Sequence, residues 1–134
     1  MHPYEWALLR VVPRVDRGEF VNVGVLLYCR PRDYLGLLLT DRLDRALALD
    51  PDLDLAAVTE HLAAVREVCS GDAGAGANGA RPAGERFRWL VAPRSTVVQP
   101  SPVHTGLTAD PAATLTGLFE RLVAATGSPL PDRD

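Results

Sequence analysis

Apolar residues alternate with polar ones, or fill both alternating phases, through the first third of the chain. From Tyr4 to Val12 both phases are largely apolar, which is typical of a strand covered on both faces. A turn at Arg14 to Gly18 leads to a second alternating run from Phe20 to Arg30, and Tyr34 to Thr40 follows as a third. Short polar turns between strands favour antiparallel neighbours, so these segments predict a three-strand meander.

The apolar spacing becomes helical after Thr40. A short helix is expected from Asp41 to Leu49, and a longer one should end at Ser70 and Gly71. A third helix should follow Asp110 and Pro111, an N-cap and a proline at the first helical position. The stripes that predict the second and third helices repeat every three or four residues: Leu55, Val58, Leu62, Val65 and Cys69, then Leu115, Leu118, Phe119 and Leu122.

The segment between the second and third helices predicts sheet. Phe87, Trp89 and Val91 alternate with arginines and a leucine, which indicates a half-buried strand with the Trp89 ring in the core. Val97 and Val98 extend the sheet until Pro100 stops it. Upstream, residues 72–84 are rich in glycine and alanine and predict a mobile loop.

Together these elements predict an α+β domain. It should contain a mainly antiparallel sheet, formed by the meander and one or two later strands, with about three helices packed on one face. The length of 134 residues fits one domain, which we expect to span residues 1–126 with a frayed tail at 127–134. The apolar runs are far shorter than the roughly 20 residues of a membrane span, and the N-terminus has no signal pattern, which favours a cytoplasmic protein.

The charged residues narrow the chemistry. All 14 basic side chains are arginine, so a P-loop lysine and a Schiff-base lysine are excluded. A formal net charge of −3 argues against a broad nucleic-acid surface, which is usually basic. Three scattered histidines and two cysteines form no closely spaced ligand pair, so we expect no metal site and no cofactor. Both cysteines end apolar segments and should be buried thiols.

Most of the candidate chemistry lies between Glu85 and Pro111, where polar side chains are framed by prolines that stiffen the backbone. Arg94, Ser95 and Thr96 resemble an anion-binding turn. The alternative is that Glu19 pairs with Arg94 or Arg10 inside the fold. With two polar residues of the first hairpin, the candidate binding residues are Arg10, Asn22, Arg88, Arg94, Ser95, Gln99, His104 and Thr105.

His104 is the candidate acid or base, because an imidazole titrates near neutral pH. A triad of Ser95 or Ser101, His104 and Glu19 can be written, but no G-x-S-x-G elbow presents the serine. A packed and hydrogen-bonded histidine is the simpler alternative.

Two segments, RVVPRVDRGEFVNVGVLLYCR and RFRWLVAPRSTVVQPSPVHTGL, resemble an uncharacterised bacterial family known as domain of unknown function 3037. The resemblance implies a small cytosolic protein of no established activity, often encoded beside HipA-like kinases, and therefore a kinase partner. The matching positions are Arg10, Glu19, Asn22, Gly24, Arg88, Trp89, Pro93, Arg94, Ser95, Gln99, Pro100, His104, Thr105 and Gly106.

Three classes of function follow from the sequence. The first is a binding or accessory module whose Arg/Ser/Gln/His pocket accepts a phosphate- or carboxylate-bearing ligand. The alternative is an enzyme that acts on a phosphorylated or nucleic-acid substrate with His104 as acid or base. A purely structural interaction protein would instead expose a broad apolar face. The sequence leaves the choice between enzyme and binding module open.

Overall fold

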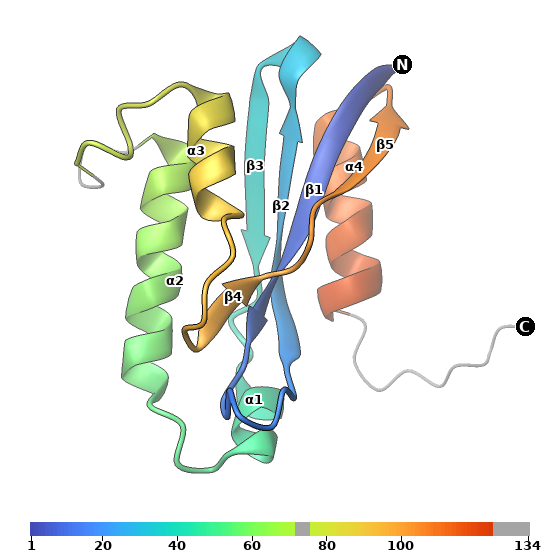
Figure 1. Cartoon of the computed structure of the whole chain (residues 1–134). Helices are drawn as coiled ribbons and strands as arrows, with labels where there is room; N and C mark the ends of the chain where they lie inside the picture. Colours follow the sequence, from blue (N-terminus) through green and yellow to red (C-terminus); the bar gives the residue numbers. More distant parts are fainter. Residues whose placement is uncertain (72–75, 125–134) are drawn as a thin grey trace, which may run out of the picture.

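The computed structural model of the chain describes residues 1–71 and 76–124 (Figure 1). Its centre is an antiparallel sheet in which the strands run in the order β3-β2-β1-β4, with β5 also paired to β1. The α+β class and the N-terminal meander are confirmed. The strands are β1 (His2–Val11), β2 (Val21–Cys29), β3 (Tyr34–Leu39), β4 (Val98–Pro100) and β5 (His104–Thr108).

Strands β4 and β5 share one edge of β1. β4 pairs with the C-terminal end of β1, and β5 pairs with its N-terminal half, from His2 to Trp6. Ser101 joins the two pairings, because its N–H donates to the Leu8 carbonyl and its hydroxyl accepts from the Leu8 N–H, both at 2.8 Å. The sequence predicted a rigid loop here and missed β5, whose side chains are mostly polar because this edge is exposed.

A β-bulge interrupts the pairing of β1 with β2. Leu9 pairs with Gly24 and Arg10 with Asn22, so Val23 is an extra residue on β2. The apolar odd phase of β2 therefore divides between the two faces of the sheet, with Val23 in one core and Val25 in the other. A side chain at Gly24 would press on β3, since its Cβ would lie 2.5 Å from Leu39 Cδ2 and 3.0 Å from the Leu38 carbonyl.

The helices begin and end largely where their caps predict. Asp54 and Asp110 accept hydrogen bonds from the N–H groups of Ala57 and Ala113, and Gly71 closes α2 in the left-handed region with φ 74°. A 3-10 helix (Arg30–Arg32) joins β2 to β3, and a π-helical turn (Glu120–Ala124) follows the last helix. The α-helices are α1 (Asp44–Leu49), α2 (Leu55–Ser70), α3 (Ala83–Leu90) and α4 (Pro111–Phe119).

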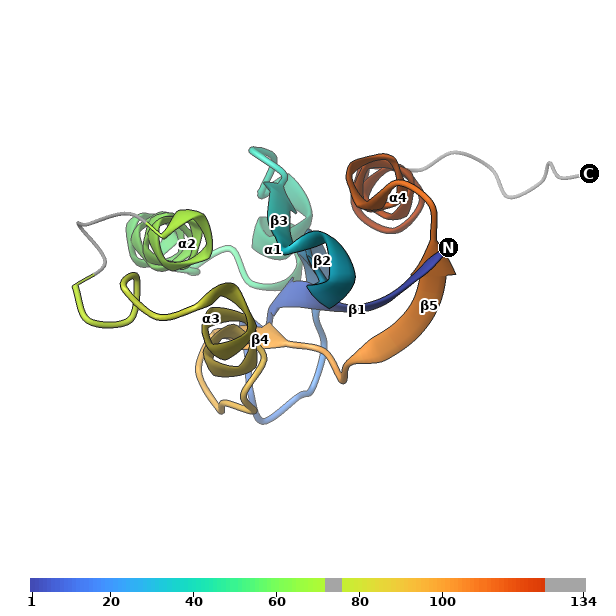
Figure 2. The same ribbon diagram turned by 90° about the horizontal axis from the view of Figure 1, so that it is seen from above.

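Helices cover both faces of the sheet, whereas the sequence predicted them on one. α2 and α3 lie on one side, and α4 lies on the other, against β2 and β3 (Figure 2). The reason is visible in β1 and β2, which are apolar in both phases and therefore need cover on both faces. Within residues 1–71 and 76–124, each helix is too short or too polar to cross a membrane.

The predicted strand around Phe87 is wrong, because this segment forms α3. Phe87, Trp89 and Val91 alternate as in a strand, but Phe87, Leu90 and Val91 are also spaced three and four residues apart, as on one side of a helix. Phe87 and Leu90 are buried against α2 and the sheet, whereas Trp89 lies on the outer side of the helix with 40% of its surface exposed. The expected burial of the Trp89 ring is therefore also wrong.

Two further expectations concern segments that the structure describes only in part. The predicted loop at 72–84 includes residues 72–75, which lie outside the described residues, and its last two residues belong to α3. The predicted tail at 127–134 lies wholly outside them. Both cysteines are buried and free, as expected, and burial raises the pKa of the Cys69 thiol to about 11.

Candidate functional site

Three of the predicted residues form a row across the sheet. Arg10 on β1 pairs with Asn22 on β2 and with Gln99 on β4, and directly opposed residues project to the same face. The bulge places Asn22 on this face, where its Nδ2 donates to the Leu122 carbonyl at 3.2 Å. Arg10 Nε and Asn22 Oδ1 are buried with no hydrogen-bond partner in the described part of the chain. The Arg10 guanidinium lies 4.1 Å from the centre of the Phe20 ring.

His104 lies on the same face as this row. It pairs with Trp6, and the two ring centroids are 4.7 Å apart. Because α4 packs mainly on β2 and β3, part of this face stays open: Trp6, Arg10 and Gln99 are half-buried, and Phe20 and His104 are exposed. We call this surface the open face: Trp6, Arg10, Phe20, Gln99 and His104. His104 is exposed there, and its role as acid or base stays a prediction.

Arg94 lies elsewhere, beside the end of α3. Its Nη2 donates to the Trp89 carbonyl at 2.6 Å, and its guanidinium stacks 4.5 Å from the Trp89 ring centre. These contacts put Arg94 on the side of the sheet where α3 packs on α2, and burial and then the charge of Arg94 lower the pKa of His61 on α2. Ser95 follows it in an exposed position. The structure therefore does not bring Arg94 and Ser95 into one concavity with Gln99 and His104.

The predicted pairing of Glu19 with Arg94 or Arg10 is wrong. Glu19 pairs with Arg17, with Arg17 Nε 2.8 Å from Glu19 Oε1, in an exposed turn. Because Glu19 is paired with Arg17, it does not serve as the acid of the serine triad. Ser101, one of the two candidate serines, is buried, and its hydroxyl donates to the Pro102 carbonyl. Among the described residues, no cluster of three or more His, Cys, Asp or Glu side chains is arranged to hold a metal ion.

Arg88 and Thr105 meet on the opposite face, around Glu5. Nη1 and Nη2 of Arg88 donate to the two oxygens of the Glu5 carboxylate, at 2.7 and 2.8 Å, and these bonds raise the pKa of Arg88. Thr105 pairs with Glu5 across β1 and β5. The contact joins residues 83 positions apart, from α3 and from the first strand. The ion pair therefore links the last turn of α3 to the first strand of the sheet.

A groove opens beside this ion pair. It consists of two hollows, of about 690 and about 500 Å³, which share Glu5, Tyr28 and Arg30 as lining residues. We call it the α3 groove. α3 comes close to its floor at Gly84, where a Cβ would lie 2.8 Å from the Tyr28 hydroxyl oxygen. The sequence did not single out Glu5, Tyr28 or Arg30, although Glu5 is the only acidic residue in β1.

The charges of the α3 groove do not balance. Arg88 is paired with Glu5, and Arg81 lies 3.6 Å from Glu85. Arg30 lines both hollows, yet within residues 1–71 and 76–124 its side chain has neither an ion pair nor a hydrogen bond. Among the described residues, the Arg30 guanidinium is therefore the one charge of the α3 groove without a counter-ion.

Comparison with known proteins supports the resemblance seen in the sequence. The family model described as "Protein of unknown function (DUF3037)" matches residues 6–123. The chain belongs to this family. No curated protein and no solved structure matches it. The DUF3037 match contains every predicted site residue, but Glu5, which holds Arg88, lies just before its first residue.

Proposed function

We propose that this DUF3037 protein is a small cytosolic binding or accessory module that holds an anionic group in the α3 groove. The observation that supports the proposal is the Arg30 guanidinium, which lines both hollows and forms no ion pair with any residue that the structure describes. Guanidinium groups bind carboxylate and phosphate oxygens through paired N–H donors. A phosphate or carboxylate group at Arg30 would balance the charge of the groove.

Neighbouring side chains suit such a ligand. The hydroxyl groups of Tyr28 and Thr105 line the same hollow as Arg30 and can donate to an anion. Glu5 would repel an anion if it were free, but Arg88 neutralises it through two short bonds. The half-exposed Trp89 ring forms an apolar wall beside Arg88. The groove therefore offers one cation, two hydroxyl groups and an aromatic surface.

Replacing Arg30 tests this proposal. We expect inorganic phosphate or succinate, titrated by calorimetry at constant ionic strength, to bind the Arg30→Gln variant at least about tenfold more weakly than the wild type. Arg32→Gln is the matched control, because Arg32 lies in the same 3-10 helix and donates to the Ala109 carbonyl instead. Equal weakening by both substitutions would show a general charge effect and contradict a site at Arg30.

A protein partner is the second part of the proposal, and the open face is the surface that supports it. Phe20 is 46% exposed beneath the Arg10 guanidinium, and the rings of Trp6 and His104 pack together on the same face. Aromatic and arginine side chains of this kind are enriched at protein interfaces. The family resemblance names a HipA-like kinase as the partner to test.

If Phe20 is a central contact of this interface, Phe20→Ser should reduce co-purification of the chain with a HipA-like kinase encoded beside it by at least about tenfold, because a hot-spot side chain contributes about 2 kcal/mol or more. Leu107→Ser is the control, since Leu107 is 64% exposed on β5 and pairs with Pro3, outside the open face. Undiminished capture by Phe20→Ser would exclude the open face as the kinase-binding surface.

A further inference from the structure

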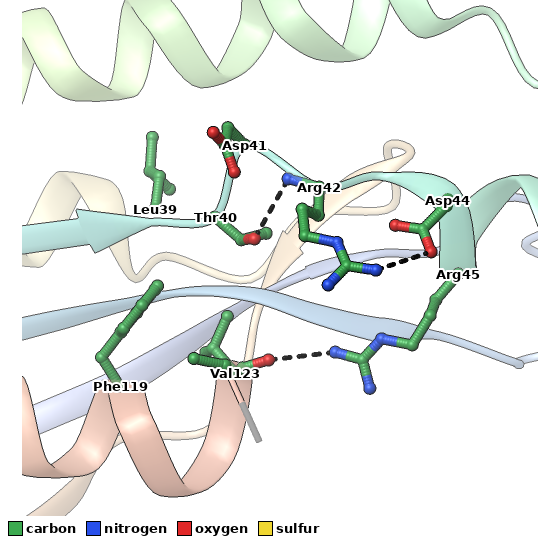
Figure 3. A pocket seen from close by; sticks show the side chains of 9 residues that line it. Leu39, Thr40, Asp41, Arg42, Asp44, Arg45, Phe119 and Val123 are labelled. Carbon is green, nitrogen blue, oxygen red and sulfur yellow. Dashed lines mark hydrogen bonds and ion pairs between the residues drawn. The ribbon is translucent and has the colours of Figure 1, made fainter. Parts of the chain in front are cut away.

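A separate pocket lies where β3 ends and α1 begins, and it shares no lining residue with the α3 groove (Figure 3). Its volume is about 670 Å³, within the range of about 300 to 1,000 Å³ that is usual for small-molecule sites. The segment from Leu39 to Arg45 forms one side, and the end of α4 with its π-helical turn forms the other. We call it the β3–α1 pocket.

Three apolar residues line this pocket. Leu39 comes from the end of β3, Phe119 from the last turn of α4, and Val123 from the turn that follows. In Figure 3, Leu39 lies beside Asp41, and Phe119 and Val123 lie across the hollow on the α4 side. Val123 is only 1% exposed, so the apolar surface open to a ligand comes from Leu39 and Phe119, which are half-buried. Such a surface favours a ligand with an apolar body.

Two arginines with different partners also line the pocket. Arg42 Nη2 lies 3.4 Å from Asp44 Oδ2, so these two charges offset each other. Arg45 Nη2 donates to the Val123 carbonyl at 3.1 Å, and this bond leaves its positive charge without a counter-ion. In Figure 3 both guanidinium groups reach from α1 and the segment before it toward Val123.

Asp41 completes the charge pattern. Its carboxylate lines the pocket but forms no ion pair within residues 1–71 and 76–124, and the same holds for the Arg45 guanidinium. The two do not pair with each other. Figure 3 shows the Asp41 carboxylate near Leu39, away from the Arg45 guanidinium. Counting only partners in the described part of the chain, the pocket thus presents one unpaired anion and one unpaired cation together with the apolar surfaces of Leu39 and Phe119.

We propose that the β3–α1 pocket binds a zwitterion with an apolar body, such as a free amino acid with a large apolar side chain or a short peptide of such residues. The ligand carboxylate contacts Arg45, the ammonium group contacts Asp41, and the apolar body packs on Leu39 and Phe119. A ligand with only one charge gains from one of these side chains and is repelled by the other. An uncharged ligand would desolvate both charges without compensation.

Titration of the full chain, followed by nuclear magnetic resonance, tests the ligand class. The probes are L-leucine, the dipeptide leucyl-leucine, 4-methylpentanoate without the amine, and 3-methylbutylamine without the carboxylate. We expect saturable shifts of the Asp41 and Arg45 amides with leucine or the dipeptide, and at least about tenfold weaker binding of both single-charge probes. Tighter binding of leucine assigns the pocket to free amino acids, and tighter binding of the dipeptide assigns it to peptides.

Two substitutions give opposite results with 4-methylpentanoate. Asp41→Asn should weaken leucine binding but strengthen 4-methylpentanoate binding, because the repelling carboxylate is removed. Arg45→Gln should weaken both. Asp52→Asn is the control, since Asp52 is exposed and lines a different hollow. Arg45→Gln removes the bond to the Val123 carbonyl and could loosen the turn after α4. Asp41→Asn keeps this bond, and because Asp41 is exposed, this variant should fold and test the proposal alone.

Equal affinity for leucine and 4-methylpentanoate, or an unchanged response to Asp41→Asn, would overturn the proposal. Failure of all four probes to cause saturable shifts would overturn it as well. Neither result bears on the α3 groove, whose arginine and probes are different.

Discussion

Replacing Phe87 with alanine should lower the free energy of unfolding by about 3 to 5 kcal/mol. Phe87 is the largest of the fully buried side chains, and its ring stacks on Tyr28 with the centroids 5.5 Å apart. It packs α3 against α2 and the sheet, so its removal leaves a cavity at the junction of three elements. Urea denaturation of the purified variant measures the loss.

Trp89→Ala is the matched control, two residues later in the same helix. Its ring is 40% exposed and contacts the Arg94 guanidinium, an interaction of about 0.5 to 1 kcal/mol at exposed sites. We expect the alanine variant to lose less than about 2 kcal/mol in total. If Phe87→Ala fails to fold, Phe87→Leu should still show a measurable loss. A larger effect at Trp89 than at Phe87 would mean that α3 presents the other side to the core.

The same pair of residues shows why the sequence misled at α3. Phe87, Trp89 and Val91 alternate, but Phe87, Leu90 and Val91 also fit one side of a helix, and a segment of eight residues is too short for periodicity to decide. Packing decides instead. α2 and the sheet need Phe87 and Leu90 to fill the core, and only helical spacing places both there. By contrast, α2 spans 16 residues, and its stripe was sufficient to predict it.

The candidate site could be predicted only in part. Regular alternation along β1 puts Arg10 on the face of Trp6, as the structure has it, but the bulge at Val23 reverses the phase of β2 and puts Asn22 on the face away from Gly24. A bulge depends on how two strands pair, and one strand's sequence does not show it. Likewise the bonds of Arg88 with Glu5 link residues 83 positions apart, which no local pattern reveals.

Ser101→Ala should lower the free energy of unfolding by about 1 to 3 kcal/mol, although it removes a single oxygen atom. Ser101 is 2% exposed and lies where the edge of the sheet changes from β4 to β5. Its flanking residues, Pro100 and Pro102, have no N–H to donate, so the Ser101 backbone and hydroxyl carry the contacts to Leu8. Alanine keeps the bond from its own N–H to the Leu8 carbonyl but leaves the buried Leu8 N–H without an acceptor.

Hydrogen exchange and urea denaturation together test this role. The Leu8 amide should exchange faster in Ser101→Ala than in the wild type, because the hydroxyl that accepts its hydrogen bond is gone. Ser95→Ala provides the control, since Ser95 is exposed and its loss should change stability by less than about 0.5 kcal/mol. Unchanged Leu8 exchange with unchanged stability would show that water replaces the hydroxyl. The joint between β4 and β5 would then depend on the prolines and on the remaining backbone bond.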